Sequence, residues 1–268
     1  MLSSKGPVWG LVLAAGSGTR FGSEKQFVTI AGHRPVDLAV ATVLSTCDEV
    51  VLVLPEGRAW DGAPVSAVVT GGPDRPASVR RGLAAIPPEV LEAEAIVVVH
   101  QAANPLATTS SVEVLLAEVR GGAPAAVPGL RPADVVRRRS TGPGETTLAG
   151  ELLGRDELVL VQTPAAFRLD VLRAAHARPT PDAQEDTALV TGAGHAVHVV
   201  DGDPRNVHVA EPADLELVEA LLLARSLDSP VDRSPAPSAG DRGVPAPRTL
   251  PGEVRIKPRR DGDAFDDD

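Results

Sequence analysis

The sequence predicts a three-layer α/β/α fold, in which helices cover both faces of a mostly parallel β-sheet. Short apolar runs alternate with longer amphipathic runs along the 268 residues, as strands alternate with helices in such folds. The clearest run, Ala-Ile-Val-Val-Val-His at residues 95–100, is continuous and β-branched, which indicates a strand buried on both faces. The first apolar run leads directly into a turn of small residues. Together these observations favour a Rossmann-like α/β domain.

The individual elements follow from the apolar periodicity in chain order. Strands are predicted at residues 8–13, 50–54, 67–70, 95–100, 158–161 and 196–200. Helices are predicted at residues 36–44, about 77–86 and 110–120. The last helix has Pro212 in its first turn and carries Leu215, Val218 and Leu222 at helical spacing.

Two segments depart from this alternation. We expect one domain over residues 1–225, with an inserted β-arm at about 129–157. Within it, the irregular stretch at 131–151 contains three consecutive arginines and is either a projecting arm or a long surface loop. Residues 226–268 are rich in Pro, Ser, Asp and Arg and lack apolar periodicity. Such a segment buries too little apolar surface to offset its ordering entropy, so we expect a disordered tail.

The composition excludes several classes of protein. The net charge of −10 argues against a dedicated nucleic-acid binder, which usually has a basic face. No stretch is long and apolar enough for a signal peptide or a membrane span. A single cysteine, Cys47, forms no intramolecular disulfide, which fits a reducing cytoplasm. The six histidines lack the spacing of a metal site, so the sequence identifies no metal ligands.

The turn after the first strand has the composition of a phosphate cradle. Residues 13–20 read Leu-Ala-Ala-Gly-Ser-Gly-Thr-Arg. Small side chains allow backbone N–H groups to approach phosphate oxygens, and glycine permits the positive φ that a cradle needs. The spacing matches neither the Walker A loop nor the dinucleotide fingerprint. Taken alone, the feature is either a phosphate cradle or a simple tight turn.

Lys25 favours the phosphate cradle. The chain has three lysines among 26 basic residues, and the other two, Lys5 and Lys257, lie in terminal segments. An ammonium group is a compact point charge suited to a single phosphate oxygen. Arg20 and Lys25 together would supply two cations for a nucleoside triphosphate. The alternative is that Lys25 is a solvated surface residue.

Several segments together resemble the sugar-phosphate nucleotidyltransferases. The motif at 13–20, followed by Lys-Gln-Phe at 25–27, is most similar to the 2-C-methyl-D-erythritol 4-phosphate cytidylyltransferase family. The resemblance covers most of residues 8–223. It includes Gly-Gly-Pro-Asp-Arg-Pro-Ala-Ser-Val at 71–79, Val-Val-His-Gln-Ala-Ala-Asn-Pro at 98–105, Arg155, the Thr-Pro pair at 163–164, and Val-Val-Asp-Gly-Asp at 199–203.

This resemblance implies transfer of a cytidylyl group from CTP to 2-C-methyl-D-erythritol 4-phosphate, with release of pyrophosphate. It implies Mg²⁺ or a similar cation held mainly by the nucleotide phosphates. It also implies a cytoplasmic homodimer formed through the arm. The residues that it assigns to catalysis are Arg20, Lys25, Arg155 and Thr163. Those that it assigns to the nucleotide are Ala14, Ala15, Gly16, Gly18, Gly72, Ser78 and Ala102.

The chain departs from the family pattern where the acceptor should bind. Gln101 replaces an aspartate, Asn104 replaces an arginine, and His208 replaces a lysine. Arg205 stands where the family has an aspartate. Gln101, Asn104 and His208 are therefore the acceptor-side candidates. Three hypotheses follow: drift in a working enzyme, a changed acceptor such as another polyol or sugar phosphate, or an inactive nucleotide-binding or scaffold relative.

Overall fold

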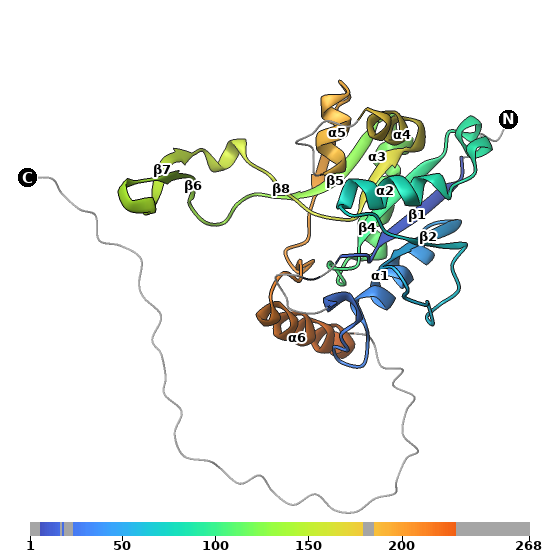
Figure 1. The fold of residues 1–268 in the computed structure, drawn as a ribbon, viewed down its shortest axis with the longest axis horizontal. Helices are drawn as coiled ribbons and strands as arrows, with labels where there is room; N and C mark the ends of the chain where they lie inside the picture. The colour runs from blue at the N-terminus through green and yellow to red at the C-terminus, as the bar shows by residue number, and fades with distance from the viewer. Residues whose placement is uncertain (1–5, 17, 19–23, 179–184, 229–268) are drawn as a thin grey trace, which may run out of the picture. The chain divides into compact units, whose positions relative to one another are not determined.

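A computed structural model describes residues 6–16, 18, 24–178 and 185–228, and the predicted tail lies almost wholly outside them (Figure 1). The main sheet has the order β10-β5-β9-β4-β1-β2-β3, with β8 paired to β5. Strands β1 (Val8–Leu13), β2 (Glu49–Leu54), β3 (Ala67–Thr70) and β4 (Ile96–Gln101) are parallel. The mostly parallel α/β sheet that the sequence predicts is confirmed.

The other half of the sheet is mixed. Strands β5 (Ala125–Leu130) and β10 (His198–Asp201) are parallel to each other. Strand β9 (Ala165–Arg168) runs antiparallel between β4 and β5. The short β8 (Leu160–Val161) is also antiparallel to β5. The predicted strand at 158–161 is therefore wrong in its first half.

Helices cover both faces of this sheet. One face packs against α2 (Arg75–Ala84), α4 (Leu169–Ala177) and α5 (Asp186–Gly192). The opposite face packs against α1 (Pro35–Leu44) and α3 (Thr109–Arg120). Helix α6 (Pro212–Asp228) packs through Val218 in a smaller apolar cluster with Ile30 and Leu106. Short 3₁₀ turns occupy η1 (Lys25–Phe27), η2 (Pro88–Ala93), η3 (Pro143–Glu145) and η4 (Arg155–Glu157).

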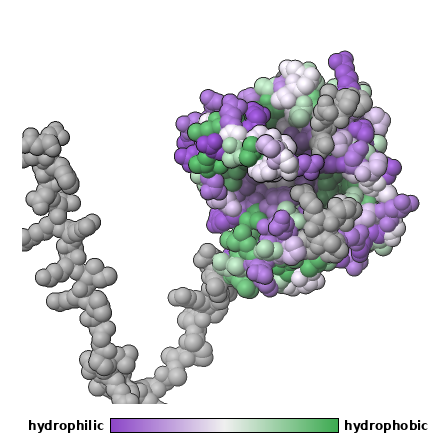
Figure 2. Space-filling model, turned by 60° about the vertical axis from the view of Figure 1, so that its left-hand side comes forward, coloured by the Kyte–Doolittle hydropathy of each residue, from purple (hydrophilic) through white to green (hydrophobic). Residues whose placement is uncertain are grey.

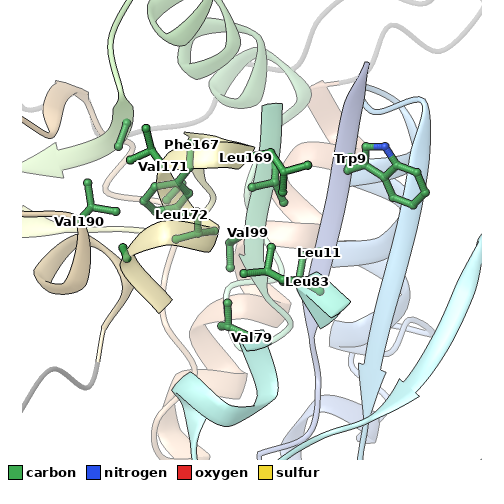
Figure 3. Close-up of a cluster of buried hydrophobic side chains, with 14 of the residues drawn as sticks. Trp9, Leu11, Val79, Leu83, Val99, Phe167, Leu169, Val171, Leu172 and Val190 are labelled. Atoms are coloured by element: carbon green, nitrogen blue, oxygen red, sulfur yellow. The ribbon is translucent and has the colours of Figure 1, made fainter. Parts of the chain in front are cut away.

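The alternation of side chains along the parallel strands explains these layers. Leu11 of β1 is fully buried against α2, whereas its neighbour Val12 is fully buried against α1. Figure 3 shows the first of these cores, where Leu11 lies near Val79 and Leu83 of α2 and Val99 of β4. Burial on both faces is why these strands read as continuous apolar runs.

The inserted segment forms a β-hairpin. Strands β6 (Val136–Thr141) and β7 (Thr147–Leu153) pair antiparallel in a sheet of their own, and the hairpin stands away from the main sheet (Figure 1). Leu148 and Leu152 of β7 are 45% and 59% exposed. The hairpin therefore exposes apolar side chains that no other described element covers. On the face of the molecule drawn in Figure 2, apolar residues form separate patches among polar ones.

Four elements were not predicted: β5, β9, α4 and α5. Strand β5 has the sequence Ala-Ala-Val-Pro-Gly-Leu, in which Pro128 and Gly129 are typical of a turn. Strand β9 has only four residues, and α4 follows it without an intervening loop. Helix α6 also continues to Asp228, beyond the domain boundary expected at residue 225.

Candidate functional site

The small-residue turn lies at the carboxyl edge of the sheet, where β1, β2 and β4 end together. Leu13 pairs with Val53 of β2 and with Gln101 of β4. Two backbone hydrogen bonds continue this pairing past the strands: Ala14 N–H donates to Val53 O at 2.8 Å, and Ala102 N–H donates to Leu13 O at 3.0 Å. The turn and the residues after β4 are therefore held side by side.

Gln26 fixes the shape of this turn. Its side chain is 3% exposed, and its amide Nε2 donates to Ala14 O at 2.8 Å and to Gly16 O at 2.9 Å. These two bonds satisfy the carbonyl groups of Ala14 and Gly16 and hold the turn in this conformation. Gly18 has a φ of 61°, which glycine adopts without strain. A Cβ at Gly16 would meet no atom of the described residues within 4 Å.

The glycine pair after β3 packs directly against the same turn. A Cβ added at Gly71 would lie 2.2 Å from the Cβ of Ala15, so only glycine permits this approach. Ser78 Oγ accepts a hydrogen bond from Gly72 N–H at 3.0 Å and donates to Asp74 O at 2.9 Å. Asp74 also caps α2 by accepting from Ala77 N–H at 2.7 Å. These hydrogen bonds hold the start of α2 against the glycine pair.

These segments enclose a cavity of about 290 Å³. Most of the residues predicted to hold a nucleotide line this cavity, together with Lys25, Gln101 and His208. Gly72 supports Ser78 but does not itself line the cavity. Arg20 lies outside the described residues. The described residues at the wall are Leu13, Ala14, Ala15, Gly16, Gly18, Lys25, Gln26, Arg75, Ser78, Gln101, Ala102, Ala103, His208 and Ala210.

Lys25 is a partly buried residue of this wall, and its predicted role towards a phosphate stays a prediction. Its ammonium Nζ donates to the backbone oxygen of Val209. That residue belongs to the segment leading into α6, far from Lys25 in sequence. The contact holds the only lysine among the described residues at the wall of this cavity.

A second cavity, of about 630 Å³, adjoins the first. Its wall includes the predicted acceptor-side residues Gln101, Asn104 and His208, together with Thr163. Arg75, Gln101 and His208 line both cavities. The two cavities therefore meet at these side chains, and a group transferred from one ligand to another would react there.

Thr163 is held by the buried end of β4. Its Oγ1 donates to Val99 O and accepts from Gln101 N–H, both at 3.3 Å. The imidazole Nδ1 of His100 lies 3.3 Å from the same hydroxyl. His100 is fully buried, and this burial lowers the pKa of its imidazole to about 3. A neutral histidine therefore fixes the orientation of Thr163 across the whole physiological range.

The substituted acceptor-side residues bond to one another. His208 Nδ1 lies 2.8 Å from Asn104 Oδ1, and Asn104 Nδ2 donates to Asn206 O at 3.4 Å. Asn206 in turn donates to Thr163 O at 2.7 Å. Arg205 instead pairs with Asp203 at 3.1 Å and is exposed. The structure thus brings Asn104, His208 and Thr163 together, whereas Arg205 lines neither cavity.

Arg155 does not join the site within one chain. It lies in η4 at the base of the arm, is exposed, and donates through Nη1 to Ala133 O at 2.8 Å. It lines neither cavity. Its predicted contact with an acceptor is therefore not made within the described residues of one chain and stays a prediction.

Among the polar residues described at the wall of the first cavity, the sequence analysis missed two: Gln26 and Arg75. Both stand inside quoted motifs, and only their tertiary contacts distinguish them from solvated polar residues. Among the described residues, no three His, Cys, Asp or Glu side chains gather as a metal site. None of the described helices has the length and apolar character to cross a membrane.

Comparisons with known proteins agree on one family. The family model described as 2-C-methyl-D-erythritol 4-phosphate cytidylyltransferase matches residues 8–224. The enzyme of that name from Nocardia farcinica is 37% identical over 236 residues, covering 82% of this chain and 96% of the relative. The one from Deinococcus radiodurans is 39% identical over 216 residues, covering 79% and 88%. The crystal structure of the Thermus thermophilus enzyme of that name is 30% identical, with a TM-score of 0.66 over 80% of this chain and 98% of that one.

Proposed function

This chain belongs to the 2-C-methyl-D-erythritol 4-phosphate cytidylyltransferase family, and we propose on that premise that it is an enzyme transferring a cytidylyl group from CTP to 2-C-methyl-D-erythritol 4-phosphate. One observation carries the proposal at the level of the site. The turn after β1, Lys25, Ser78 and Ala102 line one cavity, and this cavity adjoins a second one at the carboxyl edge of the sheet.

The chemistry needs positioning and charge stabilisation. A phosphate oxygen of the acceptor forms a bond to the α-phosphorus of CTP, the bond from that phosphorus to the bridging oxygen of the β-phosphate breaks, and pyrophosphate leaves with the electron pair. The attacking phosphate is already an anion, so the step requires no general base. Its rate depends on holding the reactants in line and on compensating the negative charge that develops.

The residues divide this work between the two cavities. Backbone amides of residues 14–18 and the ammonium of Lys25 would hold the triphosphate, with Arg20 as a further cation. Gly72, Ser78 and Ala102 would surround the cytidine. Thr163 would face the acceptor from the second cavity.

A divalent cation such as Mg²⁺ belongs to the proposal through the nucleotide. The described side chains at the wall of the first cavity include no carboxylate, the ligand that Mg²⁺ prefers in proteins. The donor set therefore fits a cation held mainly by phosphate oxygens. When bound, the cation supplies positive charge to the phosphates.

We also propose a homodimer formed through the arm, in the cytoplasm. The exposed Leu148 and Leu152 of β7 offer apolar surface for a second subunit. A partner would bring its Arg155 towards the acceptor cavity, which one chain does not achieve alone. The single cysteine fits a reducing compartment.

A changed acceptor is the second candidate function, favoured by one observation. Asn104 and His208 stand where the family has two cations, and they bond to each other at 2.8 Å. An amide and an imidazole thus replace two permanently charged side chains, so another polyol or sugar phosphate is the alternative acceptor.

Turnover assays separate the candidates. The favoured function predicts pyrophosphate release from CTP and 2-C-methyl-D-erythritol 4-phosphate in the presence of Mg²⁺. Release only with another polyol or sugar phosphate would support the changed acceptor. Binding of CTP without release for any acceptor would identify an inactive relative. Lys25→Ala is the control, because it should lower CTP binding in all three cases.

A further inference from the structure

Arg58 contacts both ends of the turn that carries Lys25. This turn, η1, begins after Glu24 and ends at Phe27, and Phe27 N–H donates to Glu24 O at 2.9 Å. The guanidinium of Arg58 lies 4.1 Å from the centroid of the Phe27 ring. It also donates through Nη2 to the carboxylate of Glu24. One side chain therefore joins the two ends of η1.

A tight turn after β2 fixes the backbone of Arg58. Its N–H donates to Pro55 O at 3.2 Å, and Gly57 between them has a φ of 73°, which glycine adopts without strain. Strand β2 ends at Leu54 and is parallel to β1. The turn that holds Arg58 therefore lies at the same edge of the sheet as the small-residue turn after β1.

Phe27 connects Arg58 to the core and to the phosphate cradle. Its ring packs against the apolar cluster that contains Val12, and the guanidinium of Arg58 lies over the ring. A cation over an aromatic face is attracted by the ring quadrupole. The neighbouring Gln26 donates to backbone carbonyls of the small-residue turn. The contact with Arg58 therefore stabilises the segment from which Gln26 and Lys25 reach the nucleotide cavity.

Arg58 also compensates a negative charge beside this cavity. Glu24 directly precedes Lys25 and is the N-cap residue of η1, but its carboxylate does not cap the turn and pairs with Arg58 instead. Without the guanidinium, this carboxylate would repel the phosphates of a nucleotide and compete for the ammonium of Lys25. The pair is partly exposed, so its effect on binding should be small but measurable.

We propose that Arg58 is a positioning residue for the triphosphate, which holds η1 through Phe27 and neutralises Glu24 so that Lys25 keeps its place at the cavity wall. The inference rests on the proposed function and deepens it, because it adds to the nucleotide site a residue that lines neither of the two cavities. Arg58 acts only through η1 and makes no contact with CTP itself.

The test compares a ligand with phosphates and a ligand without them. Arg58→Met keeps the length of the side chain and removes its charge. We expect its dissociation constant for CTP, measured by calorimetry, to rise about 3- to 20-fold, the combined effect of one cation–π contact and one exposed ion pair. Cytidine has the same base and ribose but no phosphate, so its affinity, measured by NMR titration, should change less than about twofold.

Two further variants separate the charge of Arg58 from a general loosening of the fold. Adding Glu24→Gln to Arg58→Met removes the uncompensated carboxylate and should recover part of the lost CTP affinity. Arg34→Met is the matched control, because Arg34 stacks on the Trp60 ring at 5.5 Å and pairs with Asp61 at 2.7 Å in the same loop. Its hydrogen bonds and ion pairs within the described residues do not reach η1, so CTP affinity should stay within about twofold of wild type.

These measurements do not depend on turnover. A loss specific to CTP that Glu24→Gln relieves supports the role of Arg58 even in a protein that releases no pyrophosphate, in which case only the proposed function fails. Unchanged CTP affinity in Arg58→Met, an equal loss for cytidine, no recovery with Glu24→Gln, or an equal loss in Arg34→Met would each overturn the inference, also in an active enzyme. A wild-type protein that binds no CTP would overturn both.

Discussion

Replacing Gln26 by methionine tests whether the turn after β1 is a preorganised phosphate cradle. The substitution removes the amide that donates to Ala14 O at 2.8 Å and to Gly16 O at 2.9 Å. Methionine has a similar length and flexibility, so packing at this buried position should change little. At about 0.5–1.5 kcal/mol for each bond, the loss amounts to about 1–3 kcal/mol of turn stabilisation.

If that stabilisation holds the amides in their binding conformation, it appears directly in the affinity for CTP. The expected rise in the dissociation constant is about 5- to 150-fold, measured by calorimetry with the wild-type protein as reference. Gln162→Met is a matched control, because Gln162 donates in the same way to Asp203 O at 2.9 Å and Asn206 O at 3.2 Å beside the second cavity. It should leave CTP affinity within about twofold.

Two results would refute the reasoning. One is a folded Gln26→Met protein, verified by urea denaturation, that binds CTP as tightly as wild type. The other is an equal loss of CTP affinity in the Gln162→Met control, because the effect would then be a general loosening of the fold.

Further predictions concern pH, glycine packing and assembly. Because burial lowers the pKa of His100 to about 3 while the unfolded imidazole keeps about 6.5, the unfolded state binds more protons below pH 6.5, and stability falls as the pH falls. Between pH 7 and 5 wild type should lose about 2 kcal/mol more unfolding free energy in urea titrations than His100→Gln, and equal losses would contradict the burial argument. Gly71→Ala, whose Cβ would lie 2.2 Å from that of Ala15, should cost about 1–3 kcal/mol of stability in the same assay. The Cβ of Gly16→Ala would meet no atom of the described residues within 4 Å, so this substitution should preserve stability and weaken CTP binding; an unchanged affinity would place the phosphates elsewhere. Sedimentation should show a dimer that Leu152→Glu shifts towards monomer, and a wild-type monomer would contradict assembly through the arm.

The sequence could predict those parts of the fold that depend on local periodicity. Strands β1, β2 and β4 are continuous apolar runs because both of their faces are covered, and the turn after β1 is recognisable from its small residues. Strand β5 could not be predicted, because Pro128 and Gly129 resemble a turn until the neighbouring strands are in place.

The site was less predictable where it depends on contacts distant in sequence. Asp186 is 1% exposed, whereas an aspartate is expected at the surface, and its partner Arg75 stands 111 positions away. Gln26 follows Lys25 directly, but the direction of its amide is a tertiary feature. Arg155 could be matched by spacing alone, yet within one chain it lies away from both cavities.

The structure of the protein crystallised with CTP tests the central claim most directly. The account predicts the triphosphate against the amides of residues 14–18 and the ammonium of Lys25, with the cytosine beside Ser78 and Ala102 and the α-phosphate facing the junction with the second cavity. Density for CTP at another place, or a nucleotide cavity closed by side chains at saturating CTP, would contradict it.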